Sequence, residues 1–241
     1  MFVQLRSRGP VLLVSLALFL GGCKTLQLPG QNTASQGPSP DARLANSSEA
    51  HFFSKSGLEA CGGGALMGLA ACKLTNTCDS NKGMLTAALV GCGIGMGTNY
   101  YLDQRRSQYA NAEQRLDAEI ADVQADNRKL QTLTATATDV LKQNRLQLAQ
   151  IKTQLARKQL AKASAEQQLA KVDANTRYLN TTLADLKKRE QQWRQVASSE
   201  QANSAKKQQL NTEINHMQRQ ISSLQQDVQQ VEQQRNAIVL G

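Results

Sequence analysis

The chain has few of the residues from which a large globular core is built. Aromatic side chains make up 4% of its 241 residues, and its four prolines all precede residue 41. Between residues 98 and 240 the sequence contains neither glycine nor proline. Because these two residues most often interrupt helices, their absence predicts long helices and a mainly α fold.

Residues that build catalytic and metal sites are also scarce. The two histidines, His51 and His216, lie far apart in the sequence, and no Cys-x-x-Cys pair occurs. The glycine-rich runs lack the Lys-Ser/Thr ending of a phosphate-binding loop. We therefore expect a protein that is not an enzyme, with no catalytic residue, no cofactor and no metal.

The first 22 residues have the pattern of a signal peptide. Arg6 and Arg8 precede an apolar run at residues 11–20, which is too short to span a bilayer. Leu-Gly-Gly at residues 20–22 then leads to Cys23. This resembles the lipobox of bacterial lipoproteins and implies lipid attachment, including palmitate, at Cys23; an ordinary cleaved signal peptide is the alternative. Lys24 in the next position resembles the enterobacterial sorting signal for the outer membrane, with the mature chain facing the periplasm.

The chain is basic, with a formal charge of +9 that falls to +7 when Arg6 and Arg8 leave with the signal peptide. In the cytoplasm this charge would suggest nucleic acid as a partner. Outside the cytoplasm it favours anionic lipids, lipopolysaccharide or the cell wall, so we expect no nucleic acid partner. Residues 23–50, rich in Pro, Gly, Ser, Asn and Gln, are predicted to be an acylated flexible tether.

Residues 51–104 are predicted to form a glycine-rich helical hairpin. Two apolar segments, residues 57–72 and 83–102, flank a polar turn at residues 73–82. Small residues at helical spacing would let the two helix backbones approach closely. The predicted packing glycines are Gly64, Gly68, Gly91, Gly95, Gly93 and Gly97. The hairpin would also gather Phe52, Phe53, Tyr100 and Tyr101 at its open end, as at a membrane interface.

Four cysteines lie in the same region, and outside the cytoplasm they are expected to form disulfide bonds. Three pairings are possible. The hairpin geometry favours the nested pairs Cys61–Cys92 and Cys72–Cys78, since both pairs are centred in the polar turn. A zinc site is the alternative.

Gly62-Gly63-Gly64-Ala65-Leu66-Met67-Gly68, the polar turn, and residues 91–97 followed by Tyr100-Tyr101-Leu102-Asp103-Gln104 carry a family resemblance. This region resembles the glycine-zipper two-helix domain of surface-antigen-type outer-membrane lipoproteins. The resemblance implies self-association at the outer membrane and a role in cell envelope integrity. Family zippers are usually longer and free of cysteine. A stapled hairpin that rests on the membrane, or against a partner, is therefore the alternative to an inserted one.

Residues 105–241 are predicted to be a coiled coil. Apolar residues follow one heptad register from residue 116 to 186 and a second register from residue 210 to 238. Polar residues occupy six core positions of the first register: Asn127, Thr134, Asn144, Lys158, Lys162 and Thr176. The change of register predicts either a stammer in one continuous helix or a fold-back near residues 195–209, and the fold-back is slightly favoured.

One stretch of the coil, between Asp139 and Glu166, contains no acidic residue. It is predicted either to be an ordinary solvated face or to bind an anionic envelope polymer or an acidic partner. The basic residues of this predicted surface are Lys142, Arg145, Lys152, Arg157, Lys158 and Lys162.

Two functional hypotheses follow. In the first, the chain is a structural outer-membrane lipoprotein that forms a homo-oligomer through its hairpin. In the second, it is an accessory lipoprotein of a secretion system or transport machine, whose coiled coil binds a periplasmic partner.

Overall fold

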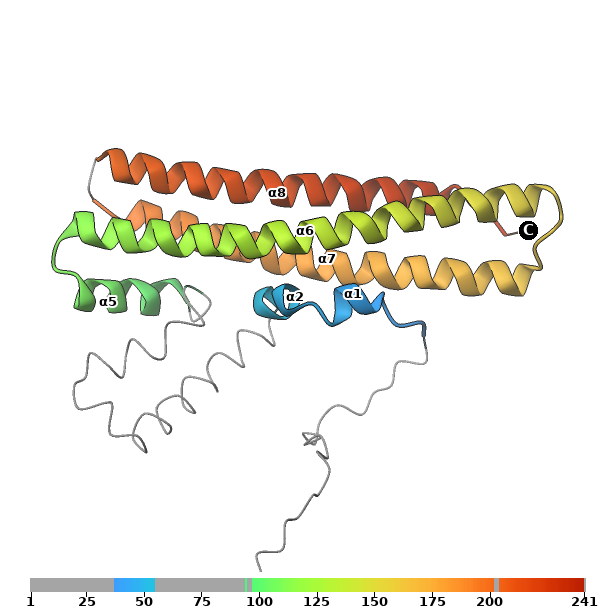
Figure 1. Ribbon diagram of the computed structural model, residues 1–241, viewed down its shortest axis with the longest axis horizontal. Coiled ribbons are helices and arrows are strands. Elements are labelled where there is room, and N and C mark those ends of the chain that lie inside the picture. Colours follow the sequence, from blue (N-terminus) through green and yellow to red (C-terminus); the bar gives the residue numbers. More distant parts are fainter. Residues whose placement is uncertain (1–36, 55–93, 95–96, 202–203, 241) are drawn as a thin grey trace, which may run out of the picture. The chain divides into compact units, whose positions relative to one another are not determined.

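The computed structural model describes residues 37–54, 94, 97–201 and 204–240, and every regular element in these ranges is a helix (Figure 1). This confirms the predicted mainly α fold. The helices are α1 (Ala42–Ala45), α2 (Ser48–Phe53), α5 (Thr98–Gln108), α6 (Ala112–Ala156), α7 (Lys162–Ser199) and α8 (Ala205–Asn236).

The three long helices fold back on one another and share one core. Asp126 of α6 bonds Arg189 of α7, and Asn144 of α6 bonds Asn175, so the first two helices are antiparallel. Helix α8 returns antiparallel to α7 and parallel to α6, which it contacts along its length (Figure 1). The apolar heptad positions of both registers meet inside this bundle, where residues such as Leu130, Leu179 and Leu224 are almost fully buried. The apolar heptad positions of the coil are therefore covered within one chain.

The predicted fold-back near residues 195–209 is confirmed. Helix α7 ends at Ser199, and α8 begins at Ala205 after Ser204, whose hydroxyl accepts a bond from the Lys207 backbone N–H. Such N-caps satisfy backbone groups that the helix leaves free, and they mark where a helix begins. The change of heptad register therefore marks the end of one helix and the start of another.

A second break, at residues 157–161, was not predicted, and the expectation of one helix across this point is wrong. Helix α6 ends at Ala156 with Arg157 as its C-cap, and Lys158 has φ of 56°, a left-handed conformation that reverses the chain. Lys158 and Lys162 were assigned to polar core positions, but both side chains are exposed at this turn. Asn127, Asn144 and Thr176 are buried, as core positions require.

The predicted flexible tether is also wrong for residues 42–50. Asp41 caps α1 and Ser47 caps α2, so these polar residues start short helices rather than extend a linker. Leu44 and Ala50 are buried, and the Tyr178 hydroxyl of α7 donates a bond to the Leu44 carbonyl. Both helices pack beside α6, and α2 also contacts α7.

Helix α5 corrects the prediction that a zipper helix runs through residue 102. Gly97 caps α5 with φ of 107° and ψ of 144°, which a helix cannot contain, so the helix begins at Thr98 and crosses the predicted domain boundary at residue 104. Tyr101 was expected at a membrane interface. Instead it is fully buried, with its ring 5.4 Å from that of Trp193 in an edge-to-face contact. No helix in the described ranges is long and apolar enough to cross a membrane.

Candidate functional site

Most residues that were singled out near the N-terminus lie outside the described residues. These are Cys23, Cys61, Cys72, Cys78, Cys92, Gly64, Gly68, Gly91, Gly93 and Gly95. Their roles in lipid attachment, disulfide bonding and helix packing stay predictions. Gly97 is described, and its positive φ makes it a helix cap rather than a helix-packing residue.

The predicted basic surface is described in full, and it lies at the end of the bundle where α6 turns into α7. Lys142, Arg145 and Lys152 project from the last part of α6. Arg157 and Lys158 form the turn, and Lys162 opens α7. The structure therefore brings the six residues to one end of the molecule but divides them between a groove and a turn.

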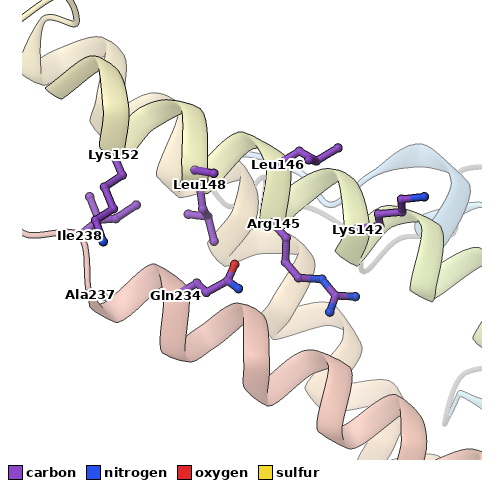
Figure 2. A pocket seen from close by; sticks show the side chains of 9 residues that line it. Lys142, Arg145, Leu146, Leu148, Lys152, Gln234, Ala237 and Ile238 are labelled. Carbon is purple, nitrogen blue, oxygen red and sulfur yellow. The ribbon is translucent and has the colours of Figure 1, made fainter. Parts of the chain in front are cut away.

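Lys142, Arg145 and Lys152 line an apolar groove between α6 and α8 (Figure 2). Its volume is about 440 Å³, within the usual range for ligand pockets. The other lining residues are Leu146, Leu148, Ala149, Gln234, Ala237 and Ile238. We call this site the end groove.

The floor and the rim of the end groove differ in chemistry. Leu148 and Ile238 form a buried floor, 2% and 7% exposed, whereas Leu146 on the outer edge is 59% exposed. In Figure 2, Leu148 and Arg145 extend from α6 toward α8, and Lys152 lies beside Ile238. Leu146 is therefore the large apolar side chain of this groove that a partner could cover.

The rim is positively charged. The guanidinium of Arg145 already has partners, because it donates hydrogen bonds to Asp227 and Gln230 of α8. Lys142 and Lys152 form no salt bridge with any residue that the structure describes. Asp139 lies three positions before Lys142 on α6, whereas no acidic residue follows Asp139 on this helix, so Lys152 has no carboxylate nearby on its own helix.

The end groove lies beside the last turns of α8 and the residues that follow this helix. Thr138 bonds Asp227 and Arg145 bonds Gln230, so parallel positions on the two helices differ by 85 to 89 residues. Asn236, the last residue of α8, is therefore level with about Ala149 of α6. The final turns of α6, up to Ala156, continue beyond the third helix, about 10 Å at the standard helical rise.

A second polar cluster lies inside the bundle and was missed by the sequence analysis. The carboxylate of Asp126 accepts bonds from Arg189 Nε at 2.7 Å, from Arg189 Nη2 at 3.1 Å and from Trp193 Nε1 at 2.8 Å. Asp126 is 4% exposed and Arg189 is 5% exposed. The guanidinium also lies 5.1 Å from the ring centre of Phe52, so the pair links α2, α6 and α7. Its enclosed position and complete pairing suit a structural role.

Glu119 is the most perturbed carboxyl group among the described residues. It is fully buried, and neither carboxyl oxygen has a hydrogen-bond partner. Burial, and next the negative charge of Glu200, raise the pKa of Glu119 to about 8. Arg115 is nearby but is bonded to Glu200, 3.1 Å away. Glu119 is therefore protonated at neutral pH.

The described residues show no arrangement suited to catalysis. His51 on α2 and His216 on α8 are both exposed. No group of three or more His, Cys, Asp or Glu side chains in the described ranges could hold a metal ion. Comparisons with protein families, with curated proteins and with solved structures find no match to this chain. The glycine-zipper resemblance therefore stays a prediction.

Proposed function

We propose that this chain is a non-enzymatic lipoprotein of the bacterial cell envelope whose helical bundle is a protein-binding module. A lipid on Cys23 would anchor it to the outer membrane, with the bundle in the periplasm. This is the second of the two sequence-based hypotheses, an accessory lipoprotein of a larger envelope machine such as a secretion system.

One observation carries the proposal. The apolar faces of α6, α7 and α8 are buried against one another within a single chain, while the end groove leaves apolar residues at the surface, with two lysines that form no salt bridge to the part of the chain that the structure describes. A bundle with its own core does not need a second copy to cover its heptad positions. A structural homo-oligomer would have to form through the glycine-rich hairpin instead.

The chemistry of the end groove also favours binding over catalysis. Its polar lining consists of Lys142, Arg145, Lys152 and Gln234, which can bind anions and amides. Apart from the amines of Lys142 and Lys152, this lining offers no side chain of the kinds that carry acid–base or covalent chemistry, since it has no carboxylate, histidine or hydroxyl group.

The envelope assignment is tested in the bacterium that makes the protein. Cells fed labelled palmitate should label the wild-type chain, and Cys23→Ala should abolish the label and release the chain from the membrane fraction. Lys24→Asp is the matched variant for sorting: it should keep the label but move the chain to the inner membrane. Equal labelling of wild type and Cys23→Ala would refute the lipid anchor.

A further inference from the structure

We propose that the end groove binds a short amphipathic helix with acidic flanks, supplied by a partner protein. The proposal deepens the proposed function, because it names the chemistry of the partner that the bundle would bind. It rests on the shape of the bundle end, on the charges around it and on the way the short helices α1, α2 and α5 pack against α6 and α7.

The shape fits a helix. Positions 142, 145, 146, 149 and 152 of α6 recur at intervals of three and four residues, so their side chains share one face. By the offset between the two helices, positions 142 to 149 lie beside the last turns of α8, and position 152 lies beyond its end. A helix laid against this face would cover Leu146, which is the exposed leucine of the groove. Amphipathic helices commonly bind such apolar grooves through side chains at this spacing.

The charges determine which helix fits. Lys142 and Lys152 lie ten positions apart on α6, about 15 Å along its axis, on either side of Leu146. A partner with apolar residues between two acidic groups would match this pattern. Arg157, Lys158 and Lys162 extend the positive charge to the adjoining turn. A basic partner helix would meet charge repulsion at both ends.

The chain already binds short helices in this way. Helices α1, α2 and α5 pack along α6 and α7, on the side of the bundle away from α8 (Figure 1). In α2, Phe53 is buried, while Lys129 of α6 lies 3.3 Å from the ring centre of Phe52. No described helix covers the end groove between α6 and α8. In α2, a short helix with a buried phenylalanine is therefore already held against this bundle beneath a lysine.

An anionic membrane surface is the competing partner. A bilayer is flat, and surface-binding segments insert protruding apolar side chains into it. The end groove is concave instead, and Leu146 is the large apolar side chain of its lining that is well exposed. A concave surface favours a helix over a flat bilayer, and the membrane becomes a separate arm of the test.

The test uses the full-length chain as the bacterium makes it, mixed with nanodiscs of neutral phosphatidylcholine. The probe is a fluorescent 14-residue helical peptide with two glutamates ten positions apart and leucines at the third, fourth and seventh positions after the first glutamate. Fluorescence anisotropy gives its affinity for the wild-type chain. The variants are Lys142→Glu with Lys152→Glu, and Leu146→Ser. Lys187→Glu with Lys188→Glu is the control, because it makes the same charge change at exposed positions of α7.

We expect saturable binding that weakens about tenfold in the Lys142/Lys152 variant and about fivefold in Leu146→Ser, with no change in the control. A peptide with lysine in place of glutamate should bind the Lys142/Lys152 variant better than the wild type. Circular dichroism checks that each variant remains helical.

Three results would overturn the proposal. The first is that the wild-type chain does not bind the peptide. The second is that the α7 control variant weakens binding as much as the Lys142/Lys152 variant does. The third is that the chain binds phosphatidylglycerol vesicles through Lys142 and Lys152 but does not bind the peptide, which would assign the site to a membrane. Failure of palmitate labelling would refute the envelope assignment without affecting peptide binding, so the two proposals fail separately.

Discussion

Replacing Asp126 by alanine should cause a large loss of stability. The substitution removes the carboxylate that accepts three hydrogen bonds and leaves the Arg189 guanidinium, 5% exposed, without its counterion. An unpaired charge in a bundle interior costs about 3–5 kcal/mol. Because a chain of this size loses roughly 2–4 °C per kcal/mol, the melting temperature should fall by about 6–20 °C.

Urea unfolding measures this loss directly. Trp193 is the only tryptophan and is fully buried beside Asp126, so its fluorescence reports on the cluster, and circular dichroism reports on the helices. Asp117→Ala is the matched control on the same helix. Its carboxylate pairs with Lys206 at the surface and is 59% exposed, so stability should not change measurably.

A double substitution separates the unpaired charge from the loss of packing. Asp126→Leu with Arg189→Met replaces both charges by apolar side chains and should recover most of the stability lost in Asp126→Ala. If Asp126→Ala is no less stable than Asp117→Ala, the cluster does not stabilise the bundle. If the double variant is less stable than Asp126→Ala, the cost does not come from the stranded guanidinium.

Three further substitutions test single features of the fold. Because the pKa of Glu119 is raised to about 8, its contribution to stability is fully present below about pH 4 and is lost as the pH rises through 8. The stability of Glu119→Gln relative to the wild type should therefore increase by about 1.4 kcal/mol per pH unit between about pH 4.5 and 8. A difference in urea titrations that stays constant with pH would contradict the raised pKa. Gly97→Ala should cost about 1–3 kcal/mol, because φ of 107° strains any side chain, and an unchanged thermal midpoint would argue against this cap. Lys158→Gly should raise the free energy of unfolding by about 1 kcal/mol, because glycine adopts φ of 56° without strain; a loss of stability would contradict the left-handed turn.

The sequence predicted the helical fold and one of the two reversals of the long helices. The break before α8 was visible because the heptad register changes there. The break at residues 157–161 was hidden, since Leu155 and Ala165 stay in register across it and their helices are antiparallel neighbours. The signal that was misread is the pair Lys158 and Lys162, whose exposed side chains mark the turn rather than a polar core.

The candidate site was predicted only in part. The absence of acidic residues between Asp139 and Glu166 pointed to a basic surface, but the groove depends on where α8 ends relative to α6. That alignment comes from tertiary packing and is not visible in local sequence. The Asp126–Arg189 pair joins residues 63 positions apart, for the same reason. Arg189 and Trp193, four residues apart on one helix face, were the only local hint.

The central claim is that the end groove holds a partner helix in the cell envelope. Its most direct test is to place a photo-crosslinking amino acid at position 146 of the full-length chain in the living bacterium, with exposed Gln167 of α7 as the control position. We predict one protein adduct at position 146, absent at position 167, whose crosslinked segment is an amphipathic helix with acidic flanks. The same adducts at both positions, or crosslinks from position 146 to lipid alone, would contradict the account.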